Sequence, residues 1–237
     1  MSSKRKTWGI IELPIMDYFE AWKFQRSLAA ARERGELEYD ILITLQHRPV
    51  FTLGRRGGRE SLKVGERFLE ECGIALVQTE RGGSITFHGP GQLVVYPILD
   101  LRAAGMSADE YMYGLEEAML GVAKEWGIAA GRDSLNRGVW VGGAKLGSIG
   151  VAIRRGITYH GLALNVNVSL EPFEWIEPCG LKGIGMTSME RELSQELPID
   201  EVERGLVRQL ERVFETCAVP LAGPEIEMVM SWRGTGV

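Results

Sequence analysis

The chain has 237 residues, of which 45% are hydrophobic and 25% are charged, and its formal net charge is −5 at pH 7. This balance is typical of a soluble globular protein with a substantial core, and no apolar run approaches the roughly 18 residues needed to span a bilayer. A net negative charge argues against a general nucleic-acid binder. Because the basic residues 1–7 are not followed by an apolar signal core, we expect a cytoplasmic protein without a membrane partner.

Hydrophobic periodicity predicts alternating strands and helices in the first half of the chain. Residues 17–34 have apolar side chains at helical spacing and stop at Gly35. A second long helix is expected over 107–126, because Ser107 and Glu110 have the Ser-x-x-Glu spacing of a capping box. The remaining expectations here are strands at 8–13, 39–45, 75–79 and 93–99, a short helix at 66–72, and loops at 47–49 and 54–58.

From residue 138 onward the pattern changes to β. Strands are expected at 139–141, 146–153 and 157–168, and a short helix at 188–193. A last amphipathic helix is predicted over 200–217, with Val202, Leu206, Leu210, Val213 and Phe214 on one face. Because no internal repeat or low-complexity linker divides the chain, we expect a single domain over 1–237 with this helix packed on it.

The three cysteines, Cys72, Cys179 and Cys217, form neither a CxxC pair nor a Cys/His group, so no zinc site and no disulfide framework is indicated. Cys72 and Cys217 lie at the ends of expected helices and are typical of small buried hydrophobic residues. Cys179 stands between a proline and a glycine, which predicts a loop where a thiol is accessible. A nucleophilic thiol there needs a base or a cation from elsewhere in the fold, because the neighbouring glutamates disfavour the thiolate.

Residues 81–96 read Arg-Gly-Gly-Ser-Ile-Thr-Phe-His-Gly-Pro-Gly-Gln-Leu-Val-Val-Tyr. The run places a polar, glycine-rich turn directly before an apolar strand. Gly82 and Gly83 allow the backbone to approach a ligand closely. Hydrogen-bonding groups around it come from Arg81, Thr86, His88 and Gln92. An ordinary decorated turn and a ligand site are both compatible with this pattern.

Lys145 is the lone cation in Gly-Gly-Ala-Lys-Leu-Gly-Ser-Ile-Gly at 142–150. A lysine in such a stretch is either a turn residue that faces water or a partly desolvated amine with altered acidity. Further along, residues 159–167 again combine small side chains with His160 and permit a close approach to a ligand.

Taken in order, four motifs resemble the lipoyl(octanoyl) transferases of lipoate biosynthesis. They are the run at 81–96, Lys145 followed by Ser148-Ile149-Gly150, His160-Gly161-Leu162-Ala163-Leu164-Asn165, and Pro178-Cys179-Gly180. The resemblance covers roughly 40–190, within a family-like core of about 35–220. Phe87 and Gly147 stand where this family more often has tyrosine and alanine. The resemblance implies an α/β (α+β) fold in which a mixed sheet is flanked by helices, as in the catalytic domain of biotin and lipoate protein ligases.

The same resemblance implies a mechanism. Cys179 takes an octanoyl group from acyl carrier protein as a thioester and passes it to a lysine ε-amine on a lipoyl domain. The recipients are the 2-oxoacid dehydrogenase complexes and the glycine cleavage H protein. Lys145 is the implied base, and His88 orients groups or stabilises the attacked carbonyl. The implied substrate pocket consists of Arg81, Gly82, Gly83, Ser84, Ile85, Thr86, Phe87, His88, Ser148, Ile149, Gly150, Gly161, Leu162 and Ala163.

The resemblance also bears on cofactors, on the oxyanion hole and on the docking of protein substrates. No metal and no resident cofactor is expected, because the phosphopantetheine arrives on the acyl carrier protein. Backbone amides near Gly82-Gly83 or Gly147-Ser148 are candidates for the oxyanion hole. Arg55, Arg56 and Arg59 are candidates for a docking patch, since the protein substrates of this family are typically acidic.

Three rival functions remain open on the sequence. An ATP-dependent lipoate ligase would use the phosphate-loop-like 54–58 and would need no nucleophilic cysteine. A thiol hydrolase would pass the acyl group from Cys179 to water. A non-catalytic binder of acyl carrier protein or of lipoyl domains would carry no acyl group at all.

Overall fold

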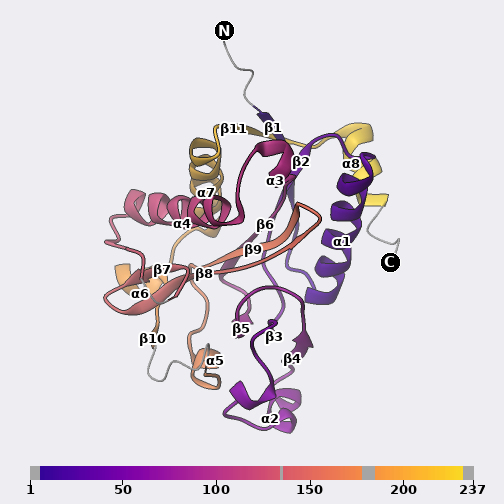
Figure 1. Ribbon diagram of the computed structural model, residues 1–237. Coiled ribbons are helices and arrows are strands. Elements are labelled where there is room, and N and C mark those ends of the chain that lie inside the picture. Colours follow the sequence, from indigo (N-terminus) through magenta and orange to yellow (C-terminus); the bar gives the residue numbers. More distant parts are fainter. Residues whose placement is uncertain (1–5, 134–135, 178–184, 232–237) are drawn as a thin grey trace.

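The computed structural model describes residues 6–133, 136–177 and 185–231. Within these ranges, eight strands form one sheet (Figure 1). They are β1 (Lys6–Glu12), β2 (Asp40–Leu45), β6 (Gln92–Ile98), β7 (Val139–Val141), β8 (Ala144–Arg154), β9 (Ile157–Asn165), β10 (Gly185–Met186) and β11 (Thr216–Pro220). The strand order is β10-β8-β9-β6-β2-β1-β11, with β7 paired to β8. β1 is parallel to β2 and β11, and β10 is parallel to β8, whereas the other pairs are antiparallel, so the predicted mixed sheet is confirmed.

Helices cover both faces of this sheet, as predicted (Figure 1). One face packs against α1 (Tyr18–Arg34) and α8 (Gly223–Ser231). The other face packs against α4 (Ala108–Glu125) and α7 (Ile199–Val213). The shorter helical elements are η1 (Arg59–Ser61), α2 (Glu66–Glu71), α3 (Leu101–Ala104), α5 (Glu171–Glu174) and α6 (Met189–Leu193).

A smaller sheet lies below the main one in Figure 1. It consists of β3 (Val50–Leu53), β4 (Ala75–Gln78) and β5 (Ile85–His88), in the order β4-β3-β5. Its own hydrophobic cluster joins it to α2 and α5 and includes Phe51, Phe87 and Phe173. The sheet therefore holds β5, and with it the end of the glycine-rich run, against the rest of the fold.

The helices α1 and α4 begin and end at the residues that the sequence indicates. The Asp17 side chain accepts hydrogen bonds from two backbone N–H groups in the first turn of α1, and Gly35 ends the helix in the left-handed conformation (φ 74°). At α4, the Ser107 and Glu110 side chains each bond the other's backbone N–H and complete the predicted capping box.

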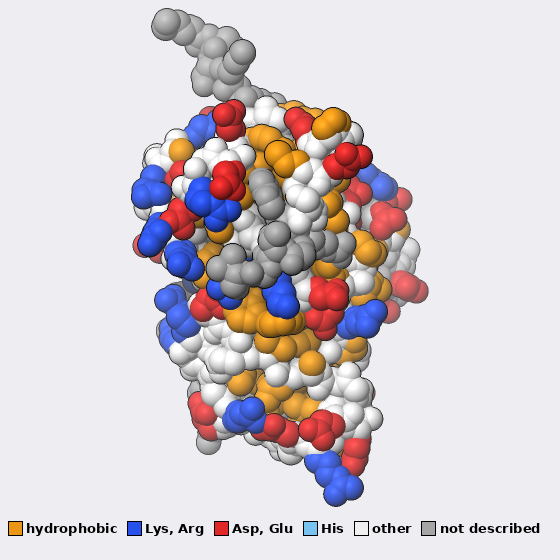
Figure 2. All heavy atoms as spheres, turned by 90° about the vertical axis from the view of Figure 1, so that its right-hand side faces the viewer, with side chains coloured by type: hydrophobic (Ala, Val, Ile, Leu, Met, Phe, Trp, Pro, Cys, Tyr) orange, Lys and Arg blue, Asp and Glu red, His pale blue; other side chains and the backbone are white. Residues whose placement is uncertain are grey.

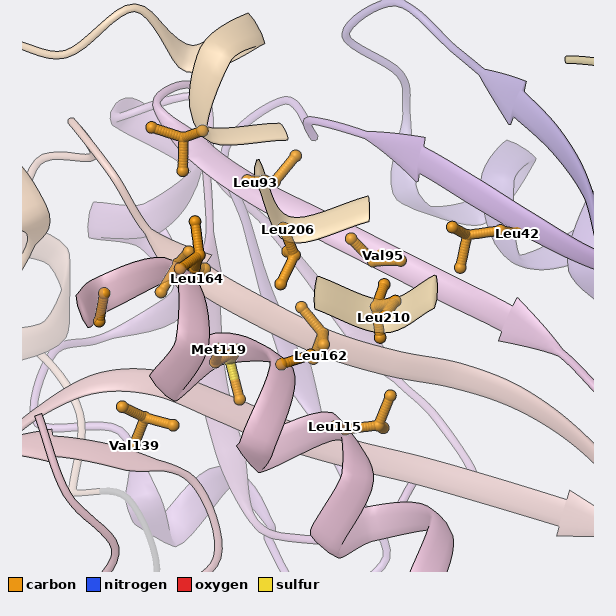
Figure 3. Close-up of a cluster of buried hydrophobic side chains, with 14 of the residues drawn as sticks. Leu42, Leu93, Val95, Leu115, Met119, Val139, Leu162, Leu164, Leu206 and Leu210 are labelled. Atoms are coloured by element: carbon orange, nitrogen blue, oxygen red, sulfur yellow. The ribbon is translucent and has the colours of Figure 1, made fainter. Parts of the chain in front are cut away.

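Leucine and valine side chains of the sheet fill the space beneath α4 and α7 (Figure 3). Each fully buried side chain of this size contributes about 1.5–3 kcal/mol through the area it removes from water. The packing therefore fixes β6, β8 and β9 relative to the helices. Figure 3 shows Leu93 and Val95 of β6 and Leu162 and Leu164 of β9 together with Leu115, Met119, Leu206 and Leu210 of the helices.

The side of the molecule that faces right in Figure 1 carries α1 and α8. Figure 2 shows hydrophobic side chains gathered across the middle of this face, with basic and acidic side chains interspersed around them. The mixture of signs gives this face no single-signed field. None of the helices in the described ranges is both long and apolar enough to cross a membrane.

The structure differs from the sequence-based prediction in several elements. β3 falls in a stretch without an expected strand, and β5 lies inside the run that was expected to be a turn. The helix predicted to end at 217 stops at Val213, because Glu215 adopts a left-handed conformation (φ 51°) and β11 then pairs in parallel with β1. α8 follows as an additional helix.

The expectation of buried structural thiols at Cys72 and Cys217 is wrong, since both side chains are exposed. Cys72 caps the C-terminus of α2, a six-residue helix in which only Leu69 is buried. Cys217 lies in β11 rather than in a helix, at a position that the strand turns outward. In both places the local structure, rather than the hydrophobicity of the thiol, decides the exposure.

Candidate active site

A cavity of about 550 Å³ opens where the glycine-rich segment 81–84 and β5 meet β8 and β9. Within the described residues, every side chain and glycine of the implied pocket borders it except Phe87. The predicted members that line it are Arg81, Gly82, Gly83, Ser84, Ile85, Thr86, His88, Lys145, Ser148, Ile149, Gly150, Gly161, Leu162 and Ala163. Cys179 lies outside the residues that the structure describes.

Phe87 points away from the cavity. Side chains alternate between the two faces of a strand, so Phe87 of β5 is turned into the core of the small sheet while Thr86 and His88 border the cavity. Its ring lies 5.3 Å from that of Phe51 and 5.5 Å from that of Phe173. The Phe87 side chain therefore packs in the core of the small sheet, and its assignment to the substrate pocket stays a prediction.

The glycine-rich segment is held from both sides by backbone hydrogen bonds. Gly54 N donates to Ser84 O at 3.1 Å, and on the other side Gly82 N donates to Val151 O of β8 at 2.9 Å. A Cβ at Gly54 would lie 2.5 Å from Gly83 O, so only glycine permits this approach. Because the Gly82 amide is engaged with Val151, it is not free to stabilise an oxyanion in this arrangement.

Arg81 is buried and ties the glycine-rich segment 81–84 to β3. Its guanidinium donates to the backbone oxygen of Thr52 at 2.6 Å, to the Thr52 hydroxyl at 2.7 Å and to Gly82 O at 2.9 Å. Arg81 thus borders the cavity while fixing the shape of the glycine-rich segment, and it places a positive charge beneath the cavity wall.

His88 lies in a buried hydrogen-bond chain. Its Nδ1 lies 2.6 Å from Gln92 Oε1, and the Gln92 amide nitrogen donates to Asn165 Oδ1 at 2.9 Å, which fixes the orientation of the amide. An amide oxygen only accepts, so Nδ1 of His88 carries the proton. Burial, reinforced by the neighbouring His47 and Arg81, holds the pKa of His88 well below its ordinary value, so the ring is neutral. Its Nε2 can then accept a hydrogen bond but not donate one, which suits orienting a donor better than stabilising an attacked carbonyl.

A second buried histidine supports the same wall. His47 Nδ1 lies 3.2 Å from Met16 O, a pure acceptor, and its Nε2 lies 2.7 Å from the Tyr96 hydroxyl. Nδ1 therefore carries the ring proton and Tyr96 donates to Nε2. Burial lowers the pKa of His47 to about 4 and raises that of Tyr96 well above its ordinary value. Both groups are uncharged near neutral pH.

The β6–β9 pairing is interrupted beside these residues. Gln92–Val95 pair with Leu162–Asn165, and continuing this register places Pro97 opposite His160. Proline has no N–H to donate to the ladder. The backbone of His160 leaves the strand conformation at this point and is left-handed, with φ 55°.

This local conformation turns the His160 side chain into the cavity wall. The rings of the consecutive residues Tyr159 and His160 lie 5.1 Å apart, whereas neighbours in a regular strand point to opposite faces. The His160 N–H donates to Gln25 Oε1 of α1 at 2.7 Å, and its Nδ1 lies 3.4 Å from the Tyr18 hydroxyl. Burial lowers the pKa of His160 to about 3. Its Nε2 has no hydrogen-bond partner among the described residues.

Lys145 lies at the opposite end of the cavity, at the start of β8 between β7 and β10. Its ammonium is 5.0 Å from the centre of the Trp140 ring. Its backbone oxygen accepts from Thr187 N at 3.0 Å, and Met186 is its partner in β10. Ile176, three residues before Cys179, and Met186, seven residues after it, also line the cavity.

The arginines of the expected docking patch differ in their surroundings. Arg55 and Arg56 are exposed at the cavity rim, and their backbone N–H groups donate to Arg81 O and Gly83 O, both at 3.0 Å. Arg59 instead pairs with Glu66. The rim therefore presents the exposed side chains of Arg55 and Arg56 on a backbone held by hydrogen bonds, whereas Arg59 is engaged in an ion pair.

Sequence reasoning missed several residues that line the cavity, among them Tyr18, Val94, Tyr96, Trp140 and His160. Tyr96 ends the quoted run and His160 begins another motif, so both residues belong to motifs noted in the sequence. The sequence does not indicate that their side chains point toward the cavity. Tyr18 comes from α1, more than 60 residues earlier than the glycine-rich segment. No group of His, Cys, Asp and Glu side chains in the described part of the chain is arranged to hold a metal ion.

Residues 17–211 match the family model of the lipoyl protein ligase A/B catalytic domain. The chain is 43% identical over 207 residues to the octanoyltransferase of Desulfotalea psychrophila, covering 86% of this chain and 93% of that protein. It is also 43% identical over 222 residues to the octanoyltransferase of Syntrophobacter fumaroxidans, covering 94% and 97%. The similarity thus extends well beyond the quoted motifs.

Solved structures share the fold at low sequence identity. A lipoate-protein ligase A bound with ATP superposes with a TM-score of 0.75 at 16% identity, covering 97% of this chain and 94% of that one. The biotin protein ligase of Aquifex aeolicus, in complex with biotin and ATP, has a TM-score of 0.52 at 13% identity, covering 87% and 70%. The predicted likeness to the catalytic domain of these ligases is confirmed at the level of the fold.

Proposed function

The chain belongs to the lipoyl protein ligase A/B catalytic domain family as one of its octanoyltransferases, and from this premise we propose that it transfers octanoyl groups through a thioester on Cys179. The donor is octanoyl-acyl carrier protein, and the acceptor is the ε-amine of a lysine on a lipoyl domain. The first step exchanges one thioester for another, and the second converts a thioester into a more stable amide. Neither step needs ATP. The resident chemistry is supplied by side chains alone, without metal or cofactor.

One observation carries the proposal: residues on both sides of Cys179 line the same cavity as Lys145. Ile176 is only three residues away, a stretch that spans at most about 11 Å when fully extended. Glu177 N donates to Ser61 O at 2.8 Å, which fixes the chain just before Cys179. The described chain on either side of Cys179 thus borders the cavity that Lys145 lines, which supports a reaction between these two groups.

The roles of the two groups follow from their chemistry. A thiolate is a good nucleophile and a good leaving group, so it can both accept and release the octanoyl unit. The Lys145 amine takes the thiol proton as Cys179 attacks and gives it to the departing phosphopantetheine thiolate. In the second step it takes a proton from the attacking acceptor amine and returns it to the departing Cys179 thiolate. His88 accepts a hydrogen bond from a substrate N–H through Nε2 and so orients the substrate.

Small and apolar residues of β8 and β9 provide the acyl site. Ile149, Leu162 and Ala163 border the cavity, and burying the roughly six methylenes of an octanoyl chain contributes about 0.8 kcal/mol each. Arg55 and Arg56 at the rim complement an acidic protein partner. The lipoyl domains of 2-oxoacid dehydrogenase complexes and the glycine cleavage H protein are the proposed recipients.

Intact-mass spectrometry tests this proposal. After mixing with octanoyl-acyl carrier protein, the protein should gain one octanoyl unit, which peptide mapping assigns to Cys179, and Cys179→Ser should gain none. Adding a lipoyl domain should then discharge the unit onto a lysine. If the protein instead takes up octanoate from free octanoate and ATP, it is a ligase. If it releases free octanoate without forming an amide on the lipoyl domain, it is a hydrolase. If it takes up no octanoyl unit from any donor, it is a non-catalytic binder.

A further inference from the structure

Glu116 of α4 is a carboxylate buried next to the Lys145 end of the cavity, and the mechanism above does not use it. It is only 2% exposed. One carboxylate oxygen accepts from Gly138 N at 2.9 Å. The other lies 3.2 Å from Arg132 Nε and 3.5 Å from Arg137 Nη1. A buried carboxylate is tolerated when it is paired and fully hydrogen-bonded in this way.

Gly138 connects this carboxylate to Lys145. Its backbone is in a region open to glycine (φ 128°). A Cβ at this position would lie 2.7 Å from Lys145 Cε and 2.3 Å from Gly147 O, so the Gly138 backbone rests directly on the aliphatic stem of Lys145. The Gly138 N–H donates to Glu116, and this hydrogen bond therefore sets the position of the Gly138 backbone against which the Lys145 stem packs.

The rest of the wall is fixed by the same segment, Asn136–Trp140. Trp140 Nε1 donates to Asn136 O at 3.2 Å, and the backbones of Trp140 and Gly131 exchange two hydrogen bonds at 2.8 Å. The Trp140 ring then faces the Lys145 ammonium at 5.0 Å. The stem of Lys145 thus has Gly138 on one side, while its charged end lies near an aromatic ring.

We propose that Glu116 is a positioning residue, which holds Gly138 and the segment Asn136–Trp140 so that the Lys145 amine points into the cavity. The proposal rests on the role of Lys145 as the base. Among the described residues, Glu116 is not one of those that line the cavity. Its charge is balanced by Arg132 and Arg137, so its contribution is geometric, through the Gly138 N–H.

Glu117 provides a matched control. It is the next residue of the same helix and also binds Arg132, at 2.8 Å, but its side chain is 40% exposed and no bond to Gly138 involves it. Glu117→Ala removes an arginine partner from the same cluster while leaving the Gly138 bond intact. A purely electrostatic or purely structural effect of the cluster would appear in both variants.

Two readouts test the proposal. Glu116→Ala should lower kcat by about 10- to 100-fold, with little change in KM for octanoyl-acyl carrier protein, because a misplaced catalytic group loses rate rather than binding. In limiting amine acetylation followed by peptide mass spectrometry, Lys145 should label severalfold faster in this variant, relative to Lys124. Glu117→Ala should leave both quantities near those of the wild type.

Glu116→Gln covers the case in which the alanine variant does not fold. Its amide oxygen can still accept a hydrogen bond from Gly138 N. We therefore expect Glu116→Gln to have a higher kcat than Glu116→Ala, and its Lys145 to be labelled more slowly than in that variant. Equal Lys145 labelling in Glu116→Ala, Glu116→Gln and Glu117→Ala would overturn the proposal. The labelling does not require Lys145 to be catalytic, so an active Lys145→Arg enzyme would remove the base assignment without deciding the role of Glu116.

Discussion

At one end of the cavity, Lys145 is half-buried among a tryptophan ring and the backbone of Asn136–Trp140, whereas at the other end His47, His88 and His160 are buried in the core between β6, β9 and α1. The lysine end is built from the start of β8, the short strands β7 and β10 beside it, and connecting segments. The histidine end is built from long paired strands and a capped helix. Changes at the first should therefore alter chemistry more than stability, and changes at the second should do the reverse.

The two ends of the cavity also differ in the burial and ionisation of their polar side chains. Lys145 places an amine at the cavity, while burial lowers the pKa of all three histidines and keeps their rings neutral. An amine that can take up and release a proton is useful where a proton must move. Neutral, hydrogen-bonded rings suit a wall that only shapes the cavity and orients what it holds.

The largest expected effect is at the lysine end. Lys145→Arg keeps a positive charge but cannot act as a base near neutral pH, so kcat should fall about 10²- to 10⁴-fold. The thermal midpoint should change little because the side chain is only partly buried. Single-turnover transfer to a lipoyl domain and differential scanning calorimetry measure the two effects. Wild-type turnover would show that the lysine end is no catalytic centre.

At the histidine end, Gly161→Ala should mainly affect folding. The added Cβ would lie 2.2 Å from Val95 O, a backbone atom that can move only with its strand. Overpacking of this kind costs about 1–3 kcal/mol, and urea unfolding measures the loss. Gly131→Ala is the control, because a Cβ there meets nothing within 4 Å. Equal midpoints for the two variants would contradict the close approach of β9 to β6.

His160→Asn should change how stability depends on pH. The folded-state pKa of His160 is about 3, against 6.5 in an unfolded chain, so between these values only the unfolded state takes up the proton. The contribution of the neutral His160 ring to the free energy of unfolding is therefore complete above about pH 6.5 and is lost as the pH falls toward 3. The substitution His160→Asn should reduce the slope of the unfolding free energy against pH by up to about 1.4 kcal/mol per pH unit.

Urea unfolding of wild type and His160→Asn from pH 4 to pH 7 measures this difference. Asparagine tolerates the left-handed conformation that residue 160 requires, so the variant should fold. Parallel pH dependences would mean that His160 is charged or accessible in the folded protein. That result would remove the contrast between the two ends of the cavity.

The smallest expected effect is at the rim. Arg55→Ala with Arg56→Ala should raise KM for octanoyl-acyl carrier protein a few-fold at low salt and much less at high salt, because rim charges chiefly steer association. Arg59→Ala should change KM less, since Arg59 already pairs with Glu66. Steady-state kinetics at two ionic strengths measure this. An equal effect for all three arginines would restore the wider docking patch.

Much of the fold could be predicted from local sequence. Asp17 and Gly35 delimit α1, and Ser107 with Glu110 begins α4, because capping is decided within a few residues. β5 was missed because its four residues follow a glycine-rich turn and pair with β3, which lies some 30 residues earlier. β11 was read as a helix end because its partner β1 is at the other end of the chain.

The candidate site divides in the same way. The sequence by itself offered Lys145, His88 and the small residues now placed in β8 and β9 as candidates, and the resemblance of their motifs to the octanoyltransferases assigned them to one site. Only the tertiary structure decided which side chains face the cavity. Pro97 cannot complete the ladder and His160 turns inward opposite it, while Phe87 turns into a separate core. Direction depends on strand pairing between distant segments, which no local pattern records.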